Sequence, residues 1–213
     1  TVGGDFFTIS ALSETQVGVF LCDVAGHGVR SALVTAMVRA LVEELKSLAS
    51  SPGEFLSKLN GDLCEILKHT GTPLLTTAFC LVADWQNGAM RYANAGHPRP
   101  LHVRRSAGQV VPLVNASGKS QPALGLLEGT QYQSSEIILT PGDLVLLFTD
   151  GLIEVQDQKG DLYTQQMLLS AVGKRLQTPT SCLFDELLNE IKEFSEGTGF
   201  TDDVCMVGVD LAR

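Results

Sequence analysis

Paired cysteines are absent from this chain of 213 residues. Its five cysteines show no C-x-x-C spacing, which argues against a zinc ribbon and against a disulfide framework. Cys22, Cys80 and Cys205 lie within apolar runs, where a thiol behaves as a small hydrophobic side chain. We therefore expect these three thiols to be buried, and we expect the chain to work in the reducing cytoplasm.

Basic residues are few, and no apolar run is long. The chain has 15 Lys and Arg against 24 Asp and Glu, a net charge of -9. Such a surface repels nucleic-acid phosphates and anionic lipid, so neither nucleic acid nor a membrane is expected as a partner. We find no signal peptide and no run of the roughly 20 apolar residues that span a bilayer. Residues 1–5 are expected to be the middle of a longer chain.

Apolar residues are plentiful by comparison. They make up 44% of the chain, and charged residues 18%, which favours a folded domain with a large core. Asn87-Gly88 is a strong hairpin signal, because both residues tolerate positive φ. The run from Leu144 to Phe148 is continuously apolar, as in a strand buried on both faces. The expected strands are residues 6–10, 17–24, 76–85, 89–94, 101–104, 109–113, 135–139, 144–148 and 204–211.

Four helices are expected, at residues 29–48, 51–67, 164–176 and 181–194. Ser51, Pro52 and Glu54 form the pattern of a capping box with proline in the first turn. The expected buried stripes are Val29, Leu33, Ala36, Met37, Ala40, Leu41, Leu45 and Leu48 in the first helix, and Phe55, Leu59, Leu63, Ile66 and Leu67 in the second. Because hairpins outnumber β-α-β units, the expected fold class is α+β, in a single domain of residues 1–213.

Acidic residues recur in one local setting. Asp5 and Asp202 each come just before an expected strand, and Asp23 and Asp150 each come at the end of one. Taken singly, an aspartate beside a glycine after a strand is more often an ordinary turn residue. Carboxylates that meet at one sheet edge repel one another unless cations lie between them, and hard oxygen ligands select Mg²⁺ or Mn²⁺. The recurrence of these acids predicts a divalent metal site.

The segment D-V-A-G-H-G at residues 23–28 is a glycine-rich turn between a strand and a helix. Its backbone N–H groups and the helix N-terminus could hold an anion. The alternative is a tight turn that needs glycine only for its φ angles. The sequence leaves both interpretations open.

Several motifs occur in order along the chain: G-G-D at 3–5, D-V-A-G-H-G at 23–28, Y-A-N-A-G-H-P at 92–98, L-G-L at 124–126, P-G-D-L-V-L-L-F-T-D-G at 141–151 and T-D-D-V at 201–204. Jointly they resemble the SpoIIE/RsbU branch of the metal-dependent PPM phosphatases, the type-2C-like family. The resemblance runs from the first residues to the last strand. It implies a β-sandwich of two mostly antiparallel sheets, flanked by helices on both outer faces.

The resemblance also implies roles for single residues. Asp23 would bridge two Mn²⁺ or Mg²⁺ ions, and the backbone carbonyl of Val24 would bind the second ion. Asp150 and Asp202 would hold the first ion. Asp5 would lie close by and ligate a metal or its bound water.

Two histidines of the motifs, His27 and His97, are candidate general acids. The alternative is that each serves backbone geometry or hydrogen bonding. His69 and His102 are expected at the surface. The catalytic set that the resemblance implies is Asp23, Asp150 and His27.

The chain departs from the family pattern at two positions. Cys205 stands where threonine is common, and Thr164 stands where a glycine often occurs. The second departure leaves the conformation between the Asp150 strand and the next helix open. Asp203 matches a position that is often polar, and it ranks below Asp202 as a ligand.

The resemblance implies a serine/threonine protein phosphatase in which a metal-activated water attacks phosphorus in line. Its substrate would be a phosphorylated STAS-type anti-sigma-factor antagonist. The domain would be the C-terminal output part of a longer regulatory protein with upstream sensor domains, and a homodimer stays open. No cysteine stands in a C-x5-R motif, which argues against a thiol-based phosphatase.

The sequence leaves two other interpretations of the function. A pseudophosphatase would keep the fold to bind a partner, but the retained acids Asp5, Asp23, Asp150 and Asp202 argue against it. A metal-dependent hydrolase of small phosphate esters or nucleotides is the third interpretation. No P-loop and no cluster of base-stacking aromatic residues supports it.

Overall fold

The computed structural model describes residues 3–26, 28–68, 74–197 and 199–211. The chain divides into two compact units, which we describe separately. The first unit comprises Thr1–His97 and Val114–Leu139, and the second comprises Pro98–Leu113 and Thr140–Arg213.

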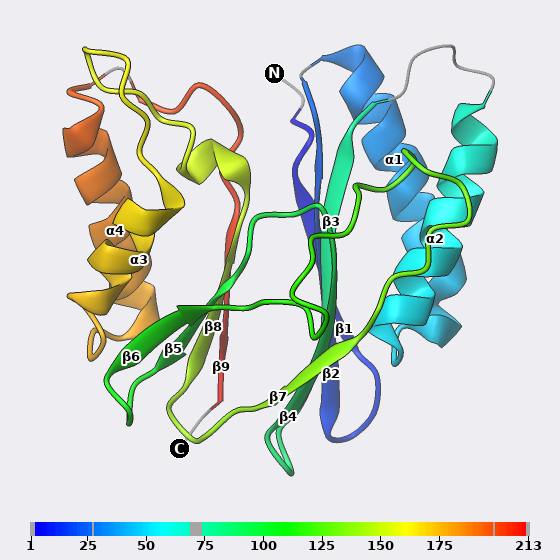
Figure 1. Cartoon of the computed structure of the whole chain (residues 1–213), viewed down its shortest axis with the longest axis horizontal. Coiled ribbons are helices and arrows are strands. Elements are labelled where there is room, and N and C mark those ends of the chain that lie inside the picture. The colour runs from blue at the N-terminus through cyan, green and yellow to red at the C-terminus, as the bar shows by residue number, and fades with distance from the viewer. Residues whose placement is uncertain (1–2, 27, 69–73, 198, 212–213) are drawn as a thin grey trace. The chain divides into compact units, whose positions relative to one another are not determined.

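The first unit is built on a five-stranded antiparallel sheet (Figure 1). Its strands, in spatial order, are β1 (Phe6–Ala11), β2 (Gln16–Val24), β3 (Thr76–Asp84), β4 (Ala89–Ala95) and β7 (Ser135–Ile138). Each lies within two residues of the bounds expected from the sequence. The β3–β4 turn has Gly88 at φ 73°, as the Asn-Gly hairpin signal predicts.

Helices cover one face of this sheet (Figure 1). They are α1 (Val29–Glu44), the short 3-10 helix η1 (Leu45–Leu48) and α2 (Pro52–Leu67). The stripe expected to be buried in the first helix is wrong for most of its length, because Val29, Leu33 and Met37 are exposed. The face that enters the core contains Val34, Val38, Leu41, Val42 and Leu45. The apolar residues of α1 are spread around nearly the whole helix, so the sequence is compatible with several different buried faces.

The start of α2 also differs from expectation. Pro52 occupies the first turn as expected, but the Ser51 side chain makes no capping hydrogen bond. The N–H of Gly53 instead donates to Ser134 Oγ at 2.9 Å. A distant loop thus satisfies one of the free N–H groups in the first turn of the helix. In the expected stripe of α2, Ile66 is 37% exposed.

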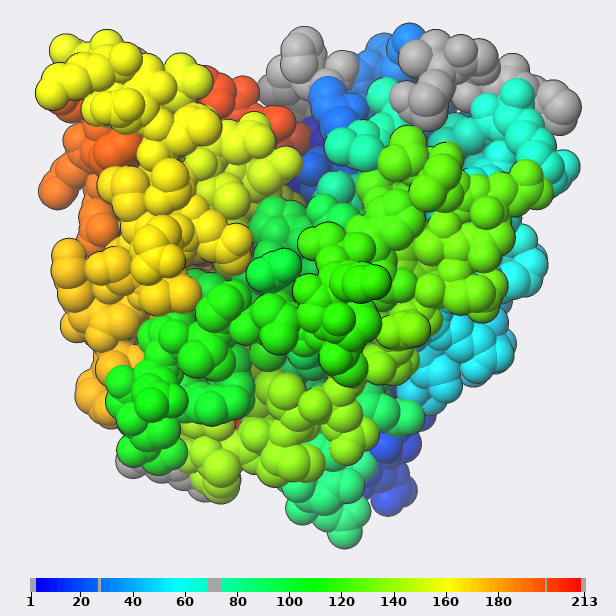
Figure 2. All heavy atoms as spheres, in the orientation of Figure 1, coloured from blue at the N-terminus to red at the C-terminus, as the bar shows by residue number. Residues whose placement is uncertain are grey.

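The segment 121–134 is held against α2, and Figure 2 shows it in green to yellow-green beside the cyan helix. Asn60 is fully buried. Its Nδ2 donates to the Leu127 carbonyl at 3.0 Å, and its Oδ1 accepts the Gly125 N–H at 2.9 Å. A buried amide with both ends paired fixes a loop firmly.

The second unit is built on a four-stranded antiparallel sheet. Its strands, in spatial order, are β6 (Gln109–Pro112), β5 (Leu101–Arg104), β8 (Leu144–Phe148) and β9 (Met206–Asp210). All five residues of β8 are buried, as the apolar run predicts. A short 3-10 helix, η2 (Asp150–Leu152), follows β8 and was not expected.

Two helices cover one face of this second sheet, α3 (Gln165–Gly173) and α4 (Thr180–Phe194) (Figure 1). Thr164, the residue that departs from the family pattern, caps α3. Its side chain accepts a hydrogen bond from the Met167 N–H at 3.3 Å, and its backbone is extended. The segment before α3 therefore needs no glycine, because threonine is a favoured N-cap residue.

His102 is buried, so its expected place at the surface is wrong. Its side chain is 2% exposed, and its Nε2 lies 3.0 Å from Asp143 Oδ2. Burial lowers the pKa of His102, and Asp143 offsets only part of that effect. The geometry suits a neutral imidazole that donates from Nε2 to the Asp143 carboxylate, while Nδ1 accepts from Arg104 Nε at 3.3 Å.

The expected α+β class with two mostly antiparallel sheets is confirmed. Cys22 and Cys80 are buried as expected, whereas Cys205 is only half-buried. All five cysteines are free thiols. Along the described part of the chain, no helix has both the length and the apolar character needed to cross a bilayer.

Candidate metal centre

In the first unit, the β1–β2 pairing brings Asp5 and Asp23 together. The last pair of that ladder is Phe6 with Cys22, and one step further places Asp5 opposite Asp23. Both carboxylates lie close enough to Cys22 to raise its pKa, although burial of the thiol is the larger cause. The antiparallel register thus supplies one pair of acids at one end of the sheet.

Gly4 makes this approach possible. A Cβ at this position would overlap the Val24 carbonyl oxygen and would lie 3.1 Å from the carbonyl carbon. The Val24 N–H donates to the Gly4 carbonyl at 3.4 Å. A residue with a side chain would push the segment that bears Asp5 away from Asp23 and Val24, so the Gly-Gly-Asp motif has a steric reason.

In the second unit, the β8–β9 pairing continues past the ends of both strands. The Thr149 N–H donates to the Cys205 carbonyl at 3.1 Å, and the Cys205 N–H donates to Thr149 Oγ1 at 2.9 Å. Asp150 therefore comes next to the segment that bears Asp202. Burial, followed by the charge of Asp202, raises the pKa of Asp150, so these two acids form a second pair.

Gly151 has the same steric role in the second unit as Gly4 has in the first. An added Cβ would overlap the Asp203 carbonyl oxygen and would lie 3.4 Å from the carbonyl carbon of Asp202. The segment 202–203 can lie against η2 only because Gly151 has no side chain. Gly4 in the first unit and Gly151 in the second thus each let an acid-bearing segment lie against the backbone of its own unit.

Glu154 is a further acid that the sequence reasoning missed. Burial raises its pKa, and the charges of Asp150 and Asp202 raise it further. Its N–H donates to the Asp150 carbonyl at 2.9 Å, in the helical turn that begins at Asp150. The spacing of four residues would have been a usable signal had a helical turn been expected after β8.

The acids fit a divalent cation by their chemistry. Their donors are hard carboxylate oxygens, and the raised pKa of Asp150 shows that its charge is poorly compensated by the protein alone. Neither unit, within its described residues, gathers three or more His, Cys, Asp or Glu side chains that could hold a metal ion.

Of the two motif histidines, only His97 lies within the described residues. His27 lies outside the described residues, so its catalytic role and the anion-binding turn stay predictions. His97 is 4% exposed, and its Nδ1 lies 2.8 Å from Thr77 Oγ1. The Asn94 side chain holds both the N–H and the carbonyl of His97. Thr77 in turn pairs with Asp23 across β2 and β3, so His97 shapes the sheet edge that carries Asp23.

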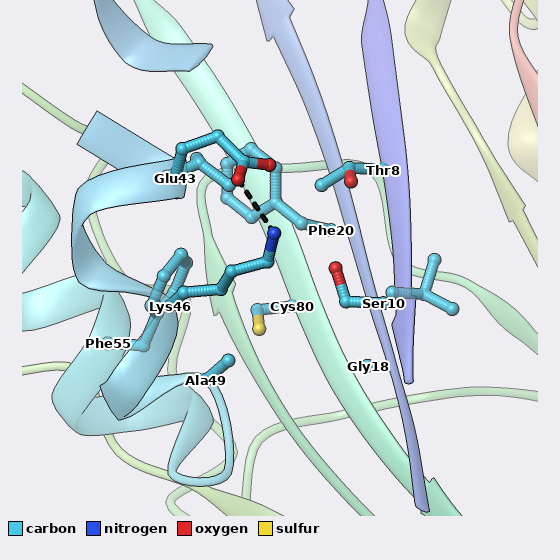
Figure 3. A pocket seen from close by; sticks show the side chains of 11 residues that line it. Thr8, Ser10, Gly18, Phe20, Glu43, Lys46, Ala49, Phe55 and Cys80 are labelled. Carbon is cyan, nitrogen blue, oxygen red and sulfur yellow. Dashed lines mark hydrogen bonds and ion pairs between the residues drawn. The ribbon is translucent and has the colours of Figure 1, made fainter. Parts of the chain in front are cut away.

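The first unit also contains a small apolar pocket of about 30 Å³. It lies between the sheet and the helices, and Figure 3 shows Phe20, Phe55 and Cys80 in its wall. Lys46 pairs with Glu43 at 2.7 Å beside it. None of the four candidate acids lines this pocket, so it is not part of the candidate metal centre.

Solved structures identify the fold. The SiaA-PP2C domain of Pseudomonas aeruginosa has a TM-score of 0.83 and 19% sequence identity, covering 98% of this chain and 80% of that chain. The crystal structure of RsbX in complex with magnesium has a TM-score of 0.64 and 20% identity, covering 98% of this chain and 87% of that one. The chain therefore has the fold of the PP2C phosphatases.

The family follows from the sequence comparison. The family model described as Stage II sporulation protein E (SpoIIE) matches residues 13–212, and the chain belongs to this family. The phosphoserine phosphatase RsbP of Bacillus subtilis (strain 168) is 28% identical over 211 residues, which cover 99% of this chain and 49% of RsbP. The chain thus spans about half the length of that relative, and the family resemblance is confirmed.

Proposed function

We propose that this chain is a metal-dependent serine/threonine protein phosphatase. The observation that carries the proposal is the pairing of acids at strand ends, Asp5 with Asp23 and Asp150 with Asp202, in a member of the SpoIIE family. The name of RsbP, a phosphoserine phosphatase, supports the same reaction. The magnesium complex of RsbX supports a divalent cation as the cofactor.

The proposed cofactor is a pair of Mn²⁺ or Mg²⁺ ions. When bound, two such ions supply an acidified water as the nucleophile and positive charge for the phosphoryl oxygens. Asp23 and the Val24 carbonyl would hold one side of the pair, and Asp150 and Asp202 the other. Asp5 would lie close by and ligate a metal or its bound water.

The chain's own residues would prepare the site before substrate arrives. Gly4 and Gly151 allow the acid-bearing segments to approach. His97, fixed by Asn94 and Thr77, would keep the edge at Asp23 in place. His27 would be placed by its motif to exchange a proton with the leaving serine or threonine oxygen.

The proposed substrate is a phosphorylated regulatory protein, of the STAS type that the family resemblance implies. The proposed setting is the cytoplasm, with residues 1–213 as a single phosphatase domain that forms the output part of a longer regulatory protein. The alternative is a pseudophosphatase that binds the same partner. The four retained acids favour the enzyme, because a binding module has no need for paired carboxylates, whose mutual repulsion costs stability.

We further propose that two copies of the chain associate through α1. Val29 and Leu33 are 76% and 55% exposed on this helix, and Met37 continues their stripe. Arg30 lies near the start of α1 and Glu44 at its end, so an antiparallel pair would place opposite charges side by side, whereas a parallel pair would oppose like charges.

Sedimentation equilibrium of the wild type is expected to show a dimer, and Leu33→Asp is expected to give a monomer. Ile138→Asp introduces the same charge at another exposed apolar residue, 60% exposed on β7, and is expected to leave the dimer intact. A wild type that sediments as a monomer at every concentration tested would rule out association through α1.

The catalytic proposal is tested by Mn²⁺-dependent hydrolysis of p-nitrophenyl phosphate and of a phosphorylated STAS-type protein. The wild type is expected to hydrolyse both, and Asp23→Asn is expected to lose on the order of a thousandfold, because a metal-bridging carboxylate acts on the transition-state charge. Circular dichroism checks that the variant is folded. Binding of the phosphoprotein without metal-stimulated turnover above the Asp23→Asn background would favour the pseudophosphatase.

A further inference from the structure

Thr35 links helix α1 to the segment that carries Asp5. Its Oγ1 lies 2.9 Å from the Ser31 carbonyl, one turn earlier in the helix, and 3.2 Å from the Gly4 carbonyl. The bond to Ser31 is the ordinary back-bond of a helical threonine. The contact with Gly4 is not local, because 31 residues separate the two. One hydroxyl hydrogen is therefore shared between the helix and the segment before β1.

The Gly4 carbonyl links the segment that carries Asp5 to the segment that carries Asp23. It accepts from Thr35 Oγ1 and also from the Val24 N–H at 3.4 Å. Gly4 precedes Asp5 directly, and Val24 follows Asp23 directly. Because the Gly4 backbone also lies against the Val24 carbonyl, a small movement of Gly4 changes the distance between the two acids.

We propose that Thr35 is a positioning residue for the metal centre. Its hydroxyl holds the Gly4 carbonyl, and through it Asp5, at the distance from Asp23 and Val24 that a divalent cation requires. The inference rests on the proposed function, because it assigns Thr35 to the same site. Residues 3–5 lie beyond the last pair of the β1–β2 ladder, so the hydrogen bonds from Val24 and Thr35 to the Gly4 carbonyl help to set their place. The Thr35 end of the contact is rigid, since α1 buries Val34 and Val38 in the core on either side of it.

The test compares Thr35→Val with Thr35→Ser. Valine keeps the side-chain shape of threonine and has a similar helix propensity, but it lacks the hydroxyl group. Serine keeps the hydroxyl group. Thr130→Val is the matched control, because Thr130 Oγ1 donates to the Leu127 carbonyl at 2.8 Å in the same unit but has no contact with Gly4. Thr35→Ala, with a better helix former, gives a second hydroxyl-free variant if the valine variant folds poorly.

Two measurements on the whole chain are made without substrate. Isothermal titration with Mn²⁺ is expected to show about tenfold weaker binding for Thr35→Val, the low end of the effect of groups that orient metal ligands. Thr35→Ser and Thr130→Val are expected to bind as the wild type does. Amide hydrogen exchange of the metal-free protein is expected to be faster at Val24 in Thr35→Val alone, because its N–H donates to the carbonyl that Thr35 holds.

The outcomes separate this inference from the proposed function. Unchanged exchange at Val24 and unchanged Mn²⁺ affinity in Thr35→Val overturn the role of Thr35, even if the wild type is an active phosphatase. Faster exchange with unchanged affinity also overturns it, because the segment would then move without consequence for the metal. A wild type that binds no Mn²⁺ overturns the proposed function and, with it, the assignment of Thr35 to a metal centre.

Discussion

Gly151→Ala is expected to reduce Mn²⁺-dependent hydrolysis by on the order of a hundredfold. The added Cβ would overlap the Asp203 carbonyl oxygen, well inside ordinary van der Waals contact at about 3.5 Å. Backbone cannot rotate away as a long side chain can, so the segment 202–203 must move by about an ångström. A displacement of that size at a catalytic group costs about a hundredfold in rate.

Gly173→Ala is the matched control in the same unit. Nothing lies within 4 Å of a Cβ at Gly173, and its φ is not positive. Because it ends helix α3, alanine is expected to leave activity unchanged and to stabilise the protein by about 0.5 kcal/mol. The measurements are kcat, the Mn²⁺ concentration for half-maximal rate, and thermal midpoints. Equal activity in both glycine variants would show that the contact between Gly151 and Asp203 does not place Asp202.

Asp150→Asn is expected to have opposite effects on activity and on stability. Hydrolysis should fall by on the order of a thousandfold, because the variant loses a charged metal ligand. The metal-free variant should melt at a higher temperature than the metal-free wild type at pH 7. The reason is that burial and the charge of Asp202 raise the pKa of Asp150, so its ionised form is unfavourable in the folded protein without a cation.

The raised pKa of Asp150 also sets the direction in which the stability of the metal-free protein changes with pH. A carboxyl group whose pKa is higher in the folded than in the unfolded state costs stability where it is ionised, and the cost disappears as the pH falls through the folded pKa. The stability advantage of Asp150→Asn in metal-free protein should therefore shrink on acidification. Adding Mn²⁺ should raise the melting midpoint of the wild type and leave that of Asp150→Asn nearly unchanged. A variant that melts lower than the wild type without metal would contradict the repulsion between Asp150 and Asp202.

The sequence predicts the strands and helices well where the pattern is local. Within the described residues, each of the nine expected strands and four expected helices has a counterpart near its expected bounds. The reason is that alternation, helical periodicity and turn residues act over a few neighbours. The 3-10 turn η2 was missed, since three residues carry too little periodicity. The start of the last strand was placed two residues early at Val204, where the chain still follows the Asp202 segment rather than the β9 ladder.

Two pairs of neighbouring acids are the part of the candidate site that the structure describes. Asp5 and Asp23 do meet through the β1–β2 register, and Asp150 and Asp202 do lie close together. The motifs contain these four acids. No sequence pattern indicates that the charges of Asp150 and Asp202 both raise the pKa of Glu154. Metal binding by all four acids, the role of His27 and the substrate remain predictions.

By itself, the sequence determined the family, the α+β class and the acids that deserve mutation, because these follow from motifs and short-range patterns. Only the tertiary structure decided which face of α1 is buried, why His102 is buried beside Asp143, and why Gly4 and Gly151 cannot carry a side chain. Each of these depends on segments distant in the chain. A helix that is apolar on several sides, a histidine beside a strand, or a glycine before an acid acquires its meaning from the atoms that pack against it.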